Sequence, residues 1–359
     1  MVNISIDGVP DGQAIQVDNF VNDSTSPAIA EFTQIDLAHG FIVISFTETI
    51  NVSSLNFDTI TFMDHFETNL ANFTLTGGFT NDSDGDVITI YLLPEDLQML
   101  QANSFLCTQR GNCYIRFTSD FIMDMVGNPV EAVPSEPPGF IVRTFGQDIF
   151  DPELLSFSLD LNEGVLSLSF NEPVRASSLD PTGIVIQGEI NTTNPTLVHR
   201  LTGGETFSND MPVININLNI ADLNALKASI FAKDTNTTFI AIEATTITDN
   251  AFTPNQVDPI GTDMALPLPD GGYTPDTTPP MLYQYTLDMD RDLLILTFNE
   301  PINPNSTSCN SITLYNSSDI SASLSQLTLT GCVIEYSEEV AGFIMITLQL
   351  TRELSLIHI

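Results

Sequence analysis

Residues 155–186 read LSFSLDLNEGVLSLSFNEPVRASSLDPTGIVI, and this stretch decides the fold. Leu166, Leu168 and Phe170 alternate with serines, so one face of the segment is apolar and the other is polar. Alternation with a period of two is the pattern of a β-strand that buries one face. The polar turn LNEG separates this strand from an earlier one, so the stretch predicts a β-hairpin.

The same hairpin pattern occurs three times along the chain. The first copy, residues 32–62, reads FTQIDLAHGFIVISFTETINVSSLNFDTITF, and the third, residues 282–314, reads LYQYTLDMDRDLLILTFNEPINPNSTSCNSITL. Equivalent acidic residues recur in the three copies, namely Asp36, Asp160 and Asp288, and then Glu48, Glu172 and Glu300. A later LTG motif also recurs, at Leu75, Leu201 and Leu329. The chain is therefore built of repeats with a period of about 124 to 128 residues.

Further strands and one short helix complete each repeat. The segments PEDLQMLQ and ADLNALKA have leucines at helical spacing, and Asp96 and Asp222 lie near their starts, where a carboxylate is favoured. About seven short strands per repeat, with turn signals between them, are typical of a two-layered sandwich. We therefore predict an all-β fold of tandem antiparallel β-sandwich domains, each with one short helix.

Proline-rich links separate the repeats and stop strand pairing across the boundaries. They read STSP before Ala28, FDPE around Pro152 and PDTTPP ending at Pro280. We predict the tail of a preceding repeat with its link at residues 1–28, and repeats at 29–151, 152–279 and 280–354, the third of them incomplete. The chain ends in LSLIHI, which one frame of a common sequencing-library adapter encodes. We interpret residues 355–359 as an artefact of a truncated transcript, with a genuine short tail as the alternative.

Two motifs give the sequence a resemblance to a known family. The stretch DTTPPMLYQYTLDMDRDLLILTFNEPINPNS at residues 276–306 resembles the opening of bacterial-type Ig-like surface repeats, and DMVGNPV at residues 124–130 resembles their late D-x-x-G-N hairpin. The resemblance implies an immunoglobulin-like sandwich and a structural or adhesive role at the cell exterior, as in S-layer proteins, adhesins and very large extracellular repeat proteins. The chain departs from the family pattern at TETI (residues 47–50) and at DNAFTPN (residues 249–255).

The charge of the chain excludes several partners. It has 46 acidic and 9 basic residues and a formal net charge of −37, so it repels nucleic acid and anionic membranes. It has no run of 18 apolar residues, so we expect no membrane span in this sequence. Bound cations or a high-salt habitat would relieve the self-repulsion. The partners that we expect are neighbouring repeats, with glycans or cell-surface proteins as further possibilities.

Calcium is the metal that the acidic residues favour. Glu48, Glu172 and Glu300 each follow an apolar strand, where they would either bind Ca²⁺ or accept backbone N–H bonds at the strand end. Acidic loops offer further oxygen ligands: Asp82, Asp84, Asp86, Asp160, Asn162, Asp288, Asp290 and Asp292. Solvated turns explain these loop residues equally well. The loop NDSDGD is not an EF-hand, because Thr80 and Tyr91 occupy its first and last ligand positions.

Cysteines and glycosylation signals suggest an extracellular protein. Cys107 pairs locally with Cys113 in sequence, and Cys309 and Cys332 share the third repeat, which favours disulfides over buried free thiols. The acceptor motif Asn-x-Ser/Thr begins at Asn3, Asn22, Asn51, Asn72, Asn81, Asn191, Asn236, Asn305 and Asn316. We therefore expect an acidic, disulfide-bonded, secreted or surface-displayed glycoprotein.

We do not expect an enzyme. With His358 set aside as part of the artefact, His39, His65 and His199 occupy non-equivalent repeat positions, and no hydrolase, zinc-protease or P-loop motif is present. Sugar binding is a competing hypothesis, but the chain has no Trp and only 7 Tyr for stacking on sugar faces. The sequence therefore favours a structural spacer, with a Ca²⁺-dependent adhesin or carbohydrate-binding surface protein as the alternative.

Overall fold

A computed structural model of the chain describes most of its residues. The described ranges are 10–65, 71–133, 140–303, 306–319, 321, 326–340 and 343–351. The chain divides into two compact units. The first consists of Met1–Leu100 and Phe105–Gln147, and the second consists of Gln101–Ser104 and Asp148–Ile359. The first unit holds one predicted repeat, and the second holds the other two.

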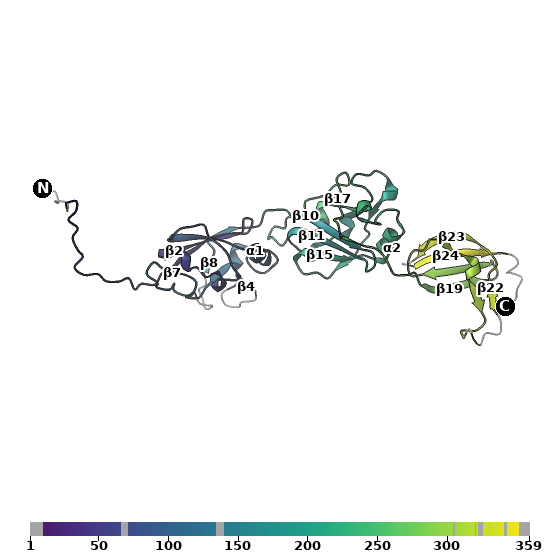
Figure 1. Ribbon diagram of the computed structural model, residues 1–359, viewed down its shortest axis with the longest axis horizontal. Helices are drawn as coiled ribbons and strands as arrows, with labels where there is room; N and C mark the ends of the chain where they lie inside the picture. Colours follow the sequence, from purple (N-terminus) through teal and green to yellow (C-terminus); the bar gives the residue numbers. More distant parts are fainter. Residues whose placement is uncertain are drawn as a thin grey trace. The chain divides into compact units, whose positions relative to one another are not determined.

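Two sheets form the first repeat (Figure 1). The strands of one sheet are β1 (Ile29–Asp36), β2 (Phe41–Asn51), β5 (Gly85–Tyr91), β7 (Met123–Asp124) and β9 (Thr144–Gly146). Their order in this sheet is β5-β2-β1-β9, and β7 also pairs with β2. The other has the order β4-β3-β6-β8, with strands β3 (Thr61–Met63), β4 (Asn72–Thr74), β6 (Tyr114–Arg116) and β8 (Phe140–Ile141). Helix α1 (Pro94–Gln101) follows β5.

The apolar faces of the two sheets pack on each other. On β2, Ile42 and Ile44 are fully buried, as the alternation predicts. Phe32 of β1 contacts Phe62 of β3 across the sandwich, with ring centroids 6.5 Å apart. Because burial of each large apolar side chain contributes about 1.5–3 kcal/mol, this interface is the main source of stability of the repeat.

The second repeat shares the strand order of the first, except that it adds β14 (Glu205–Thr206) as an edge strand and, among its described residues, has no strand paired as β7 is in the first repeat. Its first sheet has the order β14-β15-β11-β10-β18, with strands β10 (Leu154–Asp160), β11 (Val165–Val174), β14, β15 (Met211–Asn217) and β18 (Tyr273–Thr274). Its second has the order β13-β12-β16-β17, with strands β12 (Ile184–Gln187), β13 (Val198–Arg200), β16 (Phe239–Ile242) and β17 (Leu266–Pro267). Helix α2 (Ile220–Ala228) follows β15, as α1 follows β5.

The third repeat rebuilds the first sheet of the other two in part. One sheet has the order β19-β20-β24-β23, with strands β19 (Leu282–Asp288), β20 (Leu293–Phe298), β23 (Cys332–Val340) and β24 (Phe343–Leu350). A small sheet pairs β21 (Thr313–Tyr315) with β22 (Gln326–Thr328). Strand β19 is an edge strand, and its Tyr285 is 57% exposed, whereas the equivalent Phe157 of β10 is 3% exposed.

The prediction of tandem all-β immunoglobulin-like sandwiches is confirmed. The two predicted helices are present, while a helix in the third repeat and the residues 355–359 lie outside the described part of the chain. Separate apolar cores lie within residues 29–142, 154–268 and 294–350. The domain boundaries themselves stay a prediction. Within the described ranges, no helix is long and apolar enough to cross a bilayer.

One pairing differs from a purely antiparallel sandwich. The last strand of the first repeat, β9, pairs in parallel with its first strand, β1, and β18 pairs in the same way with β10. These closing strands are too short to show an alternating pattern, so no sequence pattern predicts them.

The aspartate in the first turn of each helix forms hydrogen bonds to the threonine of the recurring LTG motif. Asp222 is fully buried, and its carboxylate accepts hydrogen bonds from the Thr202 amide at 2.8 Å, the Thr202 hydroxyl at 3.1 Å and His199 at 2.9 Å. In the first repeat, Asp96 accepts from the amide and hydroxyl of Thr76 in the same way. The aspartate therefore fastens the helix to the LTG loop as well as lying in its first turn.

Candidate metal centre

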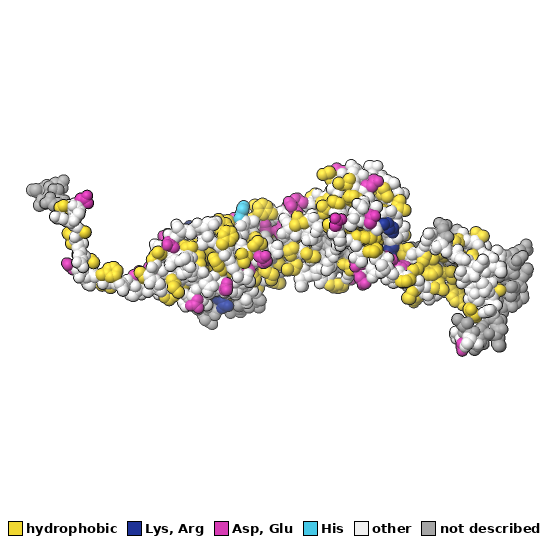
Figure 2. Space-filling model, viewed as in Figure 1, with side chains coloured by type: hydrophobic (Ala, Val, Ile, Leu, Met, Phe, Trp, Pro, Cys, Tyr) yellow, Lys and Arg dark blue, Asp and Glu magenta, His cyan; other side chains and the backbone are white. Residues whose placement is uncertain are grey.

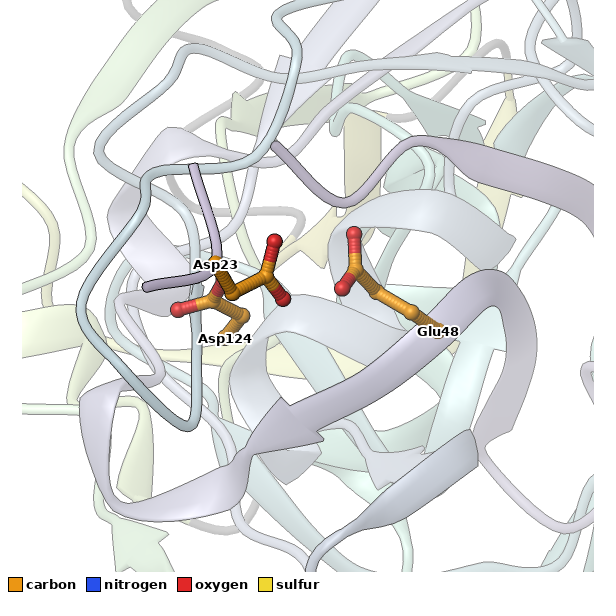
Figure 3. A group of neighbouring side chains, drawn as sticks. All are labelled: Asp23, Glu48 and Asp124. Carbon is orange, nitrogen blue, oxygen red and sulfur yellow. The ribbon is translucent and has the colours of Figure 1, made fainter. Parts of the chain in front are cut away.

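Three carboxylates from distant parts of the first repeat gather at one place (Figure 3). Asp23 comes from the link before β1, Glu48 from β2 and Asp124 from β7. Each offers one oxygen that lies within 4.8 Å of the others. Figure 3 shows the carboxylates of Asp23 and Glu48 facing each other, with that of Asp124 beside them.

The second repeat holds the equivalent cluster, and there it is buried. Asp148, Glu172 and Asp249 each offer an oxygen within 4.8 Å of the others, and they are 5%, 7% and 2% exposed. Asp148 precedes Phe157 by the same interval as Asp23 precedes Phe32. The cluster is therefore a feature of the repeat and not of one copy.

The hairpin aspartate is held in place by its own turn. Asp124 Oδ1 accepts hydrogen bonds from the amides of Val126, Gly127 and Asn128 at 2.7–2.8 Å. Burial raises the pKa of Asp124, but these bonds and the one from the Asn128 side chain outweigh it, so the pKa lies below its ordinary value. Gly127 has a φ of +97°, a backbone conformation in which glycine is favoured, so the turn selects this residue.

An asparagine joins the hairpin to the link in both repeats. Asn128 Nδ2 donates to Asp124 Oδ2 at 2.7 Å and to the Thr25 carbonyl at 3.2 Å. Asn255 Nδ2 donates to Asp249 Oδ2 at 2.8 Å and to the Asp148 carbonyl at 3.3 Å. The longer turn DNAFTPN therefore keeps the interactions of DMVGNP, and the departure from the family pattern leaves them intact.

Burial makes the second cluster electrostatically costly. Burial, and then the negative charge of Asp148 and a hydrogen bond with it, raise the pKa of Glu172 to about 9. Burial also raises the pKa values of Asp148 and Asp249. Glu172 Oε1 is buried and has no hydrogen-bond partner in the described structure. Three buried carboxylates this close can be ionised together only with a cation between them, and without a cation they retain a proton.

In the first cluster, which is more exposed to solvent, the pKa of the glutamate is also raised. Burial, followed by the charges of Asp23 and Asp124, raises the pKa of Glu48. Asp23 is exposed and Glu48 is partly exposed, so water screens this cluster more than its buried counterpart.

A lysine lies at the equivalent place before the third repeat. Lys227 Nζ lies 2.9 Å from Asp276 Oδ2 and 2.9 Å from Glu300 Oε2. Asp276 and Glu300 are the equivalents of Asp148 and Glu172 by their place in the repeat. Burial lowers the pKa of Lys227, but the hydrogen bonds to Glu300 and Asp276 raise it more, so the net shift is upward. Its counterpart at the end of α1 is the neutral Gln101, which donates to Asp148 Oδ2.

The predicted calcium ligands divide into two groups. Glu48 and Glu172 belong to the clusters, and Glu300 is paired with Lys227. The loop residues Asp82, Asp84, Asp86, Asp160, Asn162, Asp288, Asp290 and Asp292 join no group of three acidic ligands within the described ranges.

Several of these loop residues have local structural contacts. Asp84 accepts from the Val52 amide, and Asp160 accepts from the amides of Asn162 and Glu163 in its turn. Asn162 Oδ1 accepts from the hydroxyl of Thr277 in the following link. Asp288 repeats the turn contacts of Asp160. These contacts fit the alternative interpretation, solvated turns, and calcium at these loops stays a prediction.

Sequence reasoning missed the aspartates that complete the clusters. These are Asp23 and Asp148 in the links, Asp124 and Asp249 in the hairpin turns, and Asp276 as the counterpart of the link residues. The signal that could have found them is their nearly constant interval from the recurring glutamate, which the link aspartates precede by 24 or 25 residues and the hairpin aspartates follow by 76 or 77. Figure 2 shows why charge alone could not, since acidic side chains are scattered over the face in view.

No known protein family matches this chain, and no curated protein matches it either. Among solved structures, the S-layer protein SbsC is similar over 91% of this chain with 8% identity and a TM-score of 0.22. The chain covers 51% of that structure.

Other structural similarities are equally distant. Part of an alpha-2-macroglobulin from Escherichia coli has 8% identity and a TM-score of 0.26 over 90% of each chain. A three-domain piece of titin has 9% identity and a TM-score of 0.21, covering 77% of this chain and 76% of that one. At such values the similarities say nothing about what this chain does.

Proposed function

We propose that this chain is part of an extracellular structural protein, in which rigid sandwich repeats act as spacers at a cell surface or in a filament. The observation behind this proposal is the recurrence of one sandwich with equivalent residues at each link. An array built this way needs no unique site, because each unit interacts with its neighbours along the chain. The partners in this proposal are neighbouring repeats of the same protein.

Covalent chemistry supports the extracellular part of the proposal. Disulfides join Cys107 to Cys113 and Cys309 to Cys332, which is the local pairing that the sequence favoured. Such bonds persist in oxidising compartments and are rare in reducing ones.

The glycosylation signals agree with that location. Asn22, Asn72, Asn81, Asn191, Asn236 and Asn316 are exposed, and Asn51 is partly exposed. Asn3 and Asn305 lie outside the described residues. Exposure is what attachment of a bulky glycan requires, so these positions are open to modification.

Antibodies raised against the folded chain test the location and the role. We expect them to label intact source cells without permeabilisation, in a layer or filament visible by immuno-electron microscopy. A glycosidase that removes N-linked glycans should lower the mass of the native protein. Labelling that required permeabilisation would rule out this function.

An adhesive role is the alternative for the same array. The acidic clusters favour its calcium component, because cations could stiffen the links of an adhesin. A glycan array probed with the full chain, in calcium and in chelator, separates the two roles. Calcium-dependent binding to a defined glycan would favour the adhesin, and a spacer should bind none.

A further inference from the structure

We propose that the two acidic clusters are Ca²⁺ sites that fix each link to the sandwich that follows it, and that Lys227 takes the place of the ion before the third repeat. The ligands are Asp23, Glu48 and Asp124 in the first site. In the second they are the equivalent Asp148, Glu172 and Asp249. This inference goes beyond the spacer role and does not depend on it.

Among the described residues, the buried cluster has no basic counter-ion, and one of its carboxylate oxygens has no hydrogen-bond donor. Asp148, Glu172 and Asp249 are all at least nine-tenths buried, and no Lys, Arg or His ion pair with any of them exists among the described residues. Glu172 Oε1 is also without a partner there. A buried carboxylate oxygen with neither a donor nor a counter-ion is expensive, so it marks a place where a ligand binds.

The third repeat provides an independent observation. There the protein itself puts a cation between the two equivalent carboxylates, because Lys227 Nζ contacts both Asp276 and Glu300. Before the second repeat, the end of α1 supplies the neutral Gln101 in that place, and the hairpin of the second repeat adds the carboxylate of Asp249. In the third repeat a fixed ammonium therefore lies between the link carboxylate and the strand glutamate, at the place where the second repeat has a neutral amide.

The donor atoms select the kind of ion. Each cluster consists of Asp and Glu side chains, with no His or Cys. Carboxylate oxygens favour a hard cation over zinc. Ca²⁺ binds oxygens at about 2.3–2.6 Å, so two of its ligands can lie up to about 5 Å apart. In both clusters the three offered oxygens lie within 4.8 Å of one another, so a single ion can contact all three. Mg²⁺ demands a tighter octahedron and is the less suitable ion.

An ion here would act on the link. Asp148 belongs to the link, Glu172 to β11 and Asp249 to the hairpin that Asn255 already joins to the Asp148 carbonyl. Coordination by all three would add a second and stronger connection between the same segments. Calcium would therefore order the start of each repeat relative to its own sandwich.

Calorimetry on the full chain tests the ion count. The protein is purified with chelator, dialysed into physiological salt and titrated with CaCl₂. We expect two ions per chain, one for each cluster. Glu48→Gln and Glu172→Gln should each abolish the binding of one ion or lower its affinity at least about tenfold, because Ca²⁺ affinity depends on the charge of the ligands. Glu189→Gln, an exposed change in the second repeat, is the matched control and should keep both.

Thermal melting separates a lost ligand from a damaged fold. In calcium, Glu172→Gln should melt below the parent chain, since bound ligand stabilises only the folded state. In chelator it should melt at or above the parent, since a neutral amide replaces a carboxyl group that is costly to bury beside two others. A lower midpoint in both buffers, or an unchanged ion count in both glutamate variants, would overturn the proposal.

Two further controls address the lysine and the ion. Glu300→Gln should leave the calcium count at two, and loss of an ion would overturn the assignment of Lys227 as the substitute cation. NaCl or MgCl₂ at matched ionic strength should raise the midpoint less than CaCl₂, and an equal rise would mean charge screening only. A chain that binds calcium but is found inside cells would keep this inference and lose the proposed function.

Discussion

A single residue at the end of each helix determines whether the nearby buried carboxylates have a positive counter-charge. Lys227 is 11% exposed and lies between Glu300, which is 7% exposed, and Asp276, which is 24% exposed. Removing one member of such a group leaves an uncompensated charge in a poorly solvated place. The helix residue that differs between the repeats, Lys227 or Gln101, therefore determines what each link requires.

Replacing the lysine should destabilise the chain strongly. We expect Lys227→Met to lower the free energy of unfolding by about 3 kcal/mol, because Glu300 would stay buried without its counter-ion. Chemical denaturation measured in chelator gives the value. The double variant Lys227→Met/Glu300→Gln should recover much of the loss, and a double variant as unstable as the single one would contradict this explanation.

At the scale of elements, short covalent and hydrogen-bonded connections fix loops that the sheets leave free. The Cys107–Cys113 bond closes a loop over a separation of 6 residues, and Cys309–Cys332 closes one over 23 residues. The second bond joins the 3-10 helix Cys309–Ser311, which precedes β21, to the first residue of β23.

The two disulfides should differ in their contribution. By loop-closure entropy, replacing Cys107 and Cys113 with Ala should cost about 2 kcal/mol and replacing Cys309 and Cys332 about 3 kcal/mol. Differential scanning calorimetry of the two double variants measures both. The reverse order would mean that native-state packing at each site outweighs the entropy of the unfolded chain.

The strands and the site differ in how far sequence could predict them. The hairpins were predictable because alternation is local, and Ile42, Ile44, Leu166 and Leu168 are all fully buried as expected. The glutamates were found because they directly follow that alternation, although Glu48 and Glu172 lie within β2 and β11 and not after them. Asp23 and Asp148 were not, because only the folded chain brings them to residues distant in sequence, such as Asp124 and Asp249.

At the scale of the whole molecule, the calcium sites predict a dependence of the links on the ion. Phe150, in the second link, is 49% exposed and is a suitable site for chymotrypsin. We expect chelator to speed cleavage there and calcium to slow it, because the ion would hold Asp148 close by. Digestion followed by mass spectrometry identifies the cut.

The protease experiment has a matched variant. Chymotrypsin should cut the Glu172→Gln variant at the same rate in calcium and in chelator. A small chromogenic substrate checks that the protease is equally active in the two buffers. Calcium protection that persisted in this variant would place the ion elsewhere.

The parallel pairing of the first and last strands has a mechanical consequence. A tensile force applied at the two ends of the first repeat would slide β1 and β9 along each other in shear, so the hydrogen bonds of the pair would be loaded together and not one by one. The Arg143 amide, which donates to the Phe32 carbonyl at 2.9 Å, is among them. In single-molecule pulling, Arg143→Pro should rupture at a lower force than Arg143→Ala, and equal forces would show that this contact bears no load.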